Sequence, residues 1–96
     1  MADFTFDGRK LKNNRTGQKA GEVDRTRIRA WNSALLGEID RKNLRDAHGA
    51  KVAEFDGKTL KDDRGRKLAT LAEMQEAVEG ADGIELAALW YFFARK

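Results

Sequence analysis

A sixteen-residue pattern occurs three times between residues 22 and 69, and a looser copy of it starts at Thr5. The three closer copies begin at Glu22, Glu38 and Glu54, and each has apolar residues at its second and seventh positions. A repeat at a fixed period constrains the architecture more than local propensity does, because every copy must form the same supersecondary unit. The chain is therefore expected to build its shape from four similar units.

Each copy has the pattern of a β-hairpin. Apolar residues stand at position two (Phe6, Val23, Ile39, Phe55) and position seven (Leu11, Ile28, Leu44, Leu60). Between them lie an Asp and a two-residue centre, which is typical of a tight hairpin turn, and Gly8 or Gly57 at its first residue favours type II′. Arg25 and Arg41 replace that glycine, so those two turns are expected to be strained or of another type.

The hairpin register makes a second prediction, which concerns charge. Position one should lie opposite position eight, and this gives three pairs of opposite sign: Glu22 with Arg29, Glu38 with Arg45, and Glu54 with Lys61. Opposite charges across strands support a register, and like charges disfavour it. These pairs are expected to specify alignment, and each adds only about 0.2–1 kcal/mol.

The second half of each copy contains a longer turn and then a small residue. Gly49 and Gly65 suit a left-handed position in that turn, and in the copy with Ser33 we expect Asn32 to adopt it. Position fifteen (Ala20, Leu36, Val52, Leu68) is expected to pair with position seven, and a bulge or bend is expected at the small residue that follows it (Gly21, Gly37, Ala53, Ala69). The predicted fold is mainly β: an antiparallel meander of about four hairpin repeats that forms a bent or closed pseudo-four-fold roll.

The periodicity changes after the repeats. Residues 70–80 have the spacing of a short helix, with Thr70 and Glu73 as a capping box and Gly80 as a stop. Residues 83–96 predict a helix that is apolar on all sides from Leu86 to Phe93, which is too short to span a bilayer and lacks the charged face of an interfacial anchor. We expect this C-terminal hydrophobic helix to pack into or against the roll, with Arg95 and Lys96 in solvent. A contact with a partner, with a second copy or with a membrane remains the alternative.

Composition indicates one domain, residues 1–96, with the hairpin repeats at 5–69. The chain has no cysteine, which excludes disulfides and thiolate metal sites and suits the cytoplasm. The N-terminus has no basic and apolar signal pattern. The net charge of +3 hides an asymmetry. Residues 1–69 carry seventeen Lys and Arg against eleven Asp and Glu, whereas residues 70–96 carry two against five.

The chain offers little for catalysis. His48 is the only histidine and lies in a predicted turn, and Asp56, Asp62 and Asp63 match no calcium-loop spacing. No nucleophile elbow or phosphate-binding loop is present. We expect no enzyme, no cofactor and no metal site.

The recurring cations at position eight are the best binding candidates. They are Lys12, Arg29, Arg45 and Lys61, and Arg27 lies nearby. A ring of such residues could hold the phosphates of a lipid or a nucleic acid, although each could instead simply pair with its cross-strand glutamate. Trp31 at a predicted loop tip is expected to pack in part against a neighbouring hairpin, and stacking on a base or entering a membrane interface is the alternative.

Repeats of the form apolar-Asp-Gly-x-x-apolar with a downstream glycine, together with the apolar ending Leu86–Phe93, resemble the small bacterial and phage four-fold β-flower proteins. The resemblance covers nearly the whole chain, rests on turn and core residues, and implies no known activity. A looser architectural likeness is to Tubby-like and scramblase-like barrels, in which a hydrophobic helix threads a β-barrel and which bind membranes or phosphoinositides.

These observations favour a non-enzymatic binding or assembly module that acts through the rim of the repeats and the loop tips. Its partner would be an unknown protein or a second copy. The first alternative is a peripheral binder of anionic lipid that uses the basic repeat face, and the second is a nonspecific nucleic-acid binder.

Overall fold

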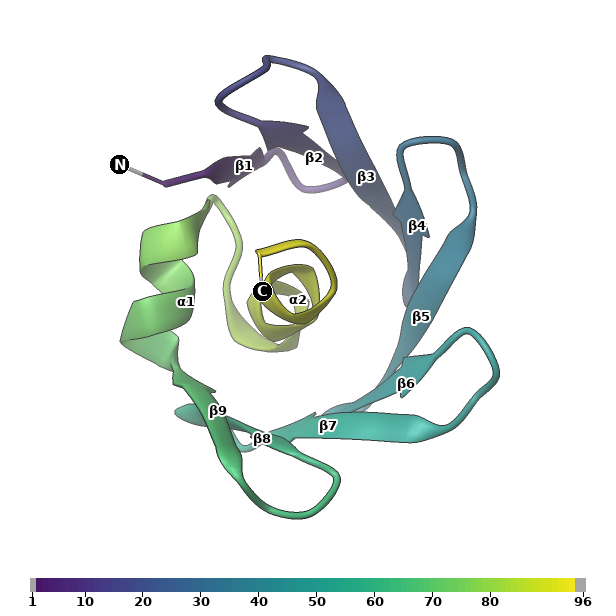
Figure 1. Ribbon diagram of the computed structural model, residues 1–96, viewed down its shortest axis with the longest axis vertical. Helices are drawn as coiled ribbons and strands as arrows, with labels where there is room; N and C mark the ends of the chain where they lie inside the picture. The colour runs from purple at the N-terminus through teal and green to yellow at the C-terminus, as the bar shows by residue number, and fades with distance from the viewer. Residues whose placement is uncertain (1, 95–96) are drawn as a thin grey trace.

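The computed structural model describes residues 2–94, and its main feature is a single sheet that curves around a central C-terminal helix (Figure 1). The strands are β1 (Phe4–Phe6), β2 (Lys10–Asn13), β3 (Lys19–Asp24), β4 (Arg27–Ala30), β5 (Leu35–Asp40), β6 (Asn43–Asp46), β7 (Lys51–Phe55), β8 (Thr59–Asp62), β9 (Lys67–Thr70) and β10 (Val78–Glu79). Strands β1 to β9 follow one another as an antiparallel meander, and β10 pairs with β1 in parallel. The protein is therefore mainly β, as the repeats predicted.

The register of the tight hairpins is the predicted one. Position two lies opposite position seven in each of them, as in Val23 opposite Ile28 and Phe55 opposite Leu60. The first turn residue has a positive φ in every copy: 103° at Gly8, 62° at Arg25, 59° at Arg41 and 100° at Gly57. The two arginines therefore have a left-handed backbone conformation, which is energetically unfavourable for any residue with a side chain. These two turns are strained, as predicted.

A β-bulge recurs where each hairpin meets the next, but it lies one residue earlier than predicted. Leu44 pairs with the small residue Ala53, and Arg45 then pairs with Lys51, so Val52 is the extra residue. The same shift leaves Ala20, Leu36 and Leu68 as extra residues in the other copies. These four bulge residues still pack against the core although they are only partly buried. Position seven thus pairs with the small residue, and not with position fifteen.

The sheet is not closed by hydrogen bonds, because β9 and β10 are its two edges. Helix α1 (Leu71–Ala77) lies between β9 and the β1–β10 pair (Figure 1). Its capping box is the predicted one, since the Thr70 hydroxyl accepts from the backbone N–H of Glu73 and the Glu73 carboxylate accepts from that of Thr70. The helix ends earlier than the predicted residue 80. Val78 is extended and pairs with Phe4, because the short edge strand β1 offers it a partner.

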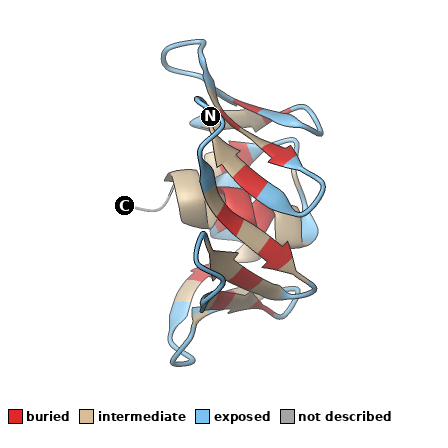
Figure 2. Ribbon diagram, turned by 90° about the vertical axis from the view of Figure 1, so that its right-hand side faces the viewer, coloured by how far each residue is buried: buried red, intermediate tan, exposed pale blue. Residues whose placement is uncertain are grey.

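The C-terminal segment fills the space that the sheet surrounds. Helix α2 (Gly83–Leu89) has four fully buried residues from Leu86 to Leu89, and it continues into the π-helix η1 (Trp90–Ala94), whose residues are only partly buried (Figure 2). Gly21 and Gly37 line this space, and a Cβ on either would overlap the ring of Phe93 or Phe92. The central helix is therefore part of the core, and the predicted solvent position of Arg95 and Lys96 lies outside the described residues.

The four long loops (residues 14–18, 31–34, 47–50 and 63–66) join the hairpins to one another. They project outward on the side of the molecule that carries the end of η1, toward the viewer in Figure 1. In the second loop Ser33 adopts the left-handed φ of 71°, and the Asn32 side chain instead accepts a hydrogen bond from the N–H of Ala34. The expectation that Asn32 would be left-handed was wrong, because its carboxamide is used to close the turn.

Candidate anion-binding surface

The structure brings the four predicted position-eight cations to equivalent places on the outer face of the sheet. Lys12, Arg29, Arg45 and Lys61 alternate with the buried position-seven residues and lie next to the long loops. Arg27 lies on the same face of β4 but at the tight-turn end, where its Nε is 3.9 Å from Glu38 Oε2. Four of the five cations therefore form one row, and Arg27 belongs to the other end of the strands.

The predicted cross-strand partners are in register, but their ion pairs are made elsewhere. Glu22 lies opposite Arg29, yet its carboxylate contacts Lys19 at 3.2 Å and Arg9 at 3.6 Å. Glu54 lies opposite Lys61, yet it contacts Lys51 at 2.8 Å. The hydrogen bonds from Lys19 and Lys51 are the main reason that the pKa values of Glu22 and Glu54 are lowered. Each glutamate thus pairs mainly with a lysine of its own strand, and more distantly with a cation of the preceding hairpin, rather than with the position-eight cation opposite it.

Position eight instead faces a second row of cations that the repeat pattern was not expected to produce. The bulged register sets Lys12 opposite Lys19, Arg45 opposite Lys51, and Lys61 opposite Lys67. Like charges directly across strands are destabilising. Glu22 and Glu54 offset this at Lys19 and Lys51, but no described carboxylate does so at Lys61 and Lys67. The signal was present in the sequence, because lysine recurs at position fourteen in three of the four copies.

Three of these lysines make no ion pair with the described carboxylates. Among residues 2–94, no carboxylate lies within ion-pair distance of the ammonium groups of Lys12, Lys61 or Lys67, and all three residues are exposed. The stretch 10–19 carries four cations and no carboxylate. A shallow pocket of about 340 Å³ opens there, and its lining includes three lysines (Lys10, Lys12, Lys19) and one carboxylate, Asp7. This is the part of the row best suited to an anion.

Arg29 and Arg45 are held differently. Each guanidinium donates to a carbonyl of its own long loop, Arg29 to Ser33 at 3.1 Å and Arg45 to Gly49 at 2.9 Å. Arg45 also donates to the Asp40 carboxylate at 3.0 Å. These two arginines therefore brace the loops, and they remain half-buried.

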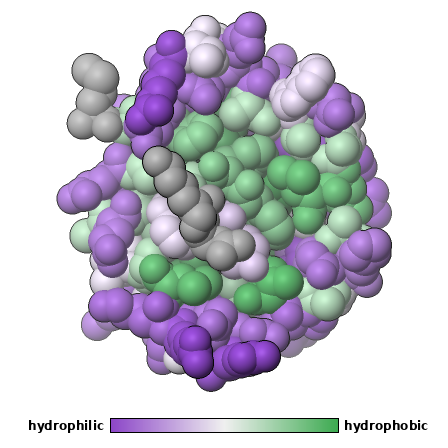
Figure 3. Space-filling model, viewed as in Figure 1, coloured by the Kyte–Doolittle hydropathy of each residue, from purple (hydrophilic) through white to green (hydrophobic). Residues whose placement is uncertain are grey.

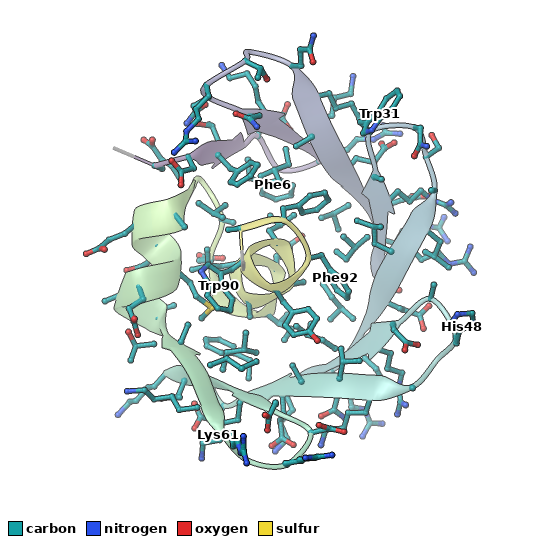
Figure 4. All side chains as sticks on the ribbon, viewed as in Figure 1. Phe6, Trp31, His48, Lys61, Trp90 and Phe92 are labelled. Carbon is teal, nitrogen blue, oxygen red and sulfur yellow. The ribbon has the colours of Figure 1, made fainter. Side chains whose placement is uncertain are left out.

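The second long loop is the exception in the row. Leu35 takes the place of the position-fourteen lysine opposite Arg29 and is 39% exposed, and Trp31 in the loop is 69% exposed. Trp31 lies at the outer edge of the molecule (Figure 4) and lines a shallow pocket with Gln18 of the first long loop and Lys19 of β3. At this loop Leu35 thus replaces the lysine that begins the strand after each of the other three loops, and Trp31 adds a second exposed apolar side chain.

The turn aspartates serve structural roles. The Asp46 carboxylate accepts from the backbone N–H groups of His48 and Ala50, and Asp62 accepts from those of Arg64 and Arg66. These backbone hydrogen bonds, that from Ala50 or from Arg66 first, lower the pKa of each carboxyl. His48 is exposed in the long loop 47–50, which follows Asp46 (Figure 4). Within residues 2–94, no three acidic or histidine side chains are grouped so that they could hold a metal.

Acidic residues gather around α1, in the gap between the two edges of the sheet (Figure 1). Asp3, Glu73, Glu76 and Glu79 line a shallow groove of about 680 Å³. This acidic groove is separate from the basic outer face of the sheet. The charge asymmetry between residues 1–69 and 70–96 thus appears mainly as two surface regions of opposite charge.

Comparison with known proteins provides no guide to this site. No family model, no curated protein and no solved structure matches the chain significantly. In the described part of the chain, no helix combines the length and the apolar character that crossing a bilayer requires.

Proposed function

We propose that this protein is a non-enzymatic binding module that engages an anionic partner through the long-loop end of its outer face. The observation that carries the proposal is the opposition of like charges in three of the four long-loop hairpins. Such pairs cost stability unless an anion compensates them. Glu22 and Glu54 supply one to Lys19 and Lys51, whereas Lys12, Lys61 and Lys67 have no described carboxylate within ion-pair distance. Lysine ammonium groups are well suited to phosphate and carboxylate groups. The finer architecture that we infer is a pseudo-four-fold roll resembling the β-flower proteins, and a cytoplasmic location suits its lack of cysteine.

The test is salt-dependent retention on immobilised heparin, which serves as a generic polyanion. The variant carries Lys12→Gln, Lys61→Gln and Lys67→Gln, three lysines at the long-loop end that make no ion pair with a described carboxylate. The matched control carries Arg25→Gln, Arg41→Gln and Lys58→Gln, which remove the same charge from exposed residues of the tight turns.

We expect the long-loop variant to elute at clearly lower salt than the wild type, and the tight-turn control to elute close to it. Equal loss in both variants would show that only net charge matters and would overturn the proposal. So would unchanged retention of the long-loop variant.

A further inference from the structure

The end of the molecule that carries the long loops also exposes an apolar surface. The residues of η1 and the bulge residues are partly buried, whereas α2 is fully buried from Leu86 to Leu89. Phe93 and Ala94 line a small cavity of about 130 Å³ together with Arg15 of the first long loop, so η1 ends beside that loop. Figure 3 shows hydrophobic residues spread over this face, with hydrophilic residues around its edge.

The edge of this face combines cations with exposed apolar side chains. Lys12, Lys61 and Lys67 lie at the bases of two long loops, and Trp31 and Leu35 project from a third. An anionic bilayer is complementary to this edge, because it presents phosphates at its surface, which suit the cations, and hydrocarbon a few ångströms below, which suits the apolar side chains. Tryptophan favours that boundary, and Trp31 is exposed at this edge, whereas Trp90 and Tyr91 of η1 pack against the core.

We propose, as an extension of the function proposed above, that the η1 end of the protein docks on an anionic lipid bilayer. The long-loop lysines contact the lipid headgroups, while Trp31 and Leu35 enter the interface. A nucleic acid would match the lysines but not the apolar face that they surround, because the phosphate backbone is recognised by charged and polar donors. The bilayer accounts for both features.

Vesicle sedimentation tests this docking. The probes are phosphatidylcholine vesicles with and without phosphatidylserine, at low and at near-physiological salt. We expect binding only to the anionic vesicles, weakened by salt. The variant with Lys12→Gln, Lys61→Gln and Lys67→Gln should bind on the order of 100-fold more weakly, since each cation near the surface contributes roughly a fivefold factor. The tight-turn control should bind like the wild type.

Fluorescence tests the apolar contact separately. In a Trp90→Phe variant Trp31 is the single tryptophan, and its emission should shift to the blue on anionic vesicles and be quenched by brominated lipid chains. In the otherwise native chain, Trp31→Ser with Leu35→Ser should weaken vesicle binding several-fold and leave heparin retention unchanged.

The outcomes separate the two proposals. Loop-specific heparin retention without vesicle binding would overturn bilayer docking and leave the anionic binding module standing, and a preference for DNA over vesicles in competition would do the same. Vesicle binding that is equal in the long-loop variant and the tight-turn control would also overturn the docking geometry. Failure of loop-specific heparin retention together with failure of vesicle binding would remove both.

Discussion

The inner and outer faces of the same sheet differ in how their side chains meet their neighbours. On the inner face each repeat position has one neighbour that fits it: position two meets position seven, and the small residue leaves room for the rings of η1. On the outer face the side chains are long and exposed, and at the long-loop end they meet residues of the same sign. The inner face therefore specifies the fold, and the outer face is free to carry charge that the fold does not need.

The largest effect is expected from the inner face. Leu44 is fully buried, so Leu44→Ala should lower the free energy of unfolding by about 3 kcal/mol through lost burial and the cavity left behind. Urea denaturation followed by circular dichroism measures this loss. A loss below about 1 kcal/mol would mean that the face repacks freely and does not define the fold.

The next effect tests the close approach of η1. Gly37→Ala places a Cβ against the Phe92 ring and the Arg45 carbonyl, and overpacking of this kind costs about 1–3 kcal/mol. The equivalent site in the next hairpin already holds Ala53, which is fully buried. Ala53→Gly is therefore the matched control, with a loss of about 1 kcal/mol from backbone entropy and lost contact. Equal tolerance of alanine at both sites would contradict the observed asymmetry.

The loss of folding stability at acid pH is expected to come from carboxylates on the outer surface and at the long loops. Backbone hydrogen bonds lower the pKa values of Asp46 and Asp62 in the folded state. A lowered folded pKa gives stability that is present above the ordinary Asp value near pH ~4 and is lost as the pH falls through the lowered values. The wild type should therefore lose stability between neutral and strongly acidic pH.

Asparagine at both positions keeps an acceptor but removes the titrating proton. Asp46→Asn with Asp62→Asn should show a shallower decline when urea midpoints are compared across pH. An identical pH profile would assign the acid response to other carboxylates, with Glu22 and Glu54 the first to examine.

The smallest effect on stability is expected where the largest effect on binding is proposed. The combined Lys12→Gln, Lys61→Gln and Lys67→Gln variant removes exposed cations, and surface changes of this kind stay within about 0.5 kcal/mol. Thermal unfolding in dilute buffer measures it. A large loss of stability would show that these lysines hold the sheet together and would merge the roles of the two faces.

The contrast between the two faces also explains what could be predicted from sequence. A period of two fixes which side chains point inward, so the pairing of Ile39 with Leu44 and the alignment of Glu38 with Arg45 follow from the repeat pattern. The bulge was misplaced by one residue, because pattern alone does not decide whether Val52 or the smaller Ala53 leaves the ladder.

Outer-face partners were less predictable for a physical reason. Lysine and glutamate side chains are long enough to reach several neighbours, so Glu54 pairs with Lys51 of its own strand and with Lys42 of the preceding hairpin, although Lys61 lies opposite it. The parallel pairing of Val78 with Phe4 was missed, because Val78 also fits the apolar face of a helix. Nothing local indicated that η1 would take π-helical geometry.

The position of α2 after all the hairpins also determines the order of synthesis and burial. The hairpins leave the ribosome first, with leucines such as Leu11 and Leu60 that have nothing to cover them until residues 83–94 are made. The N-terminal strand likewise waits for Val78 before its outer edge is paired. The core is thus completed only after that segment has been made. A chain released before that point would expose the whole inner face to its neighbours, so a shortened product should be cleared or should aggregate rather than persist as a smaller version of the protein.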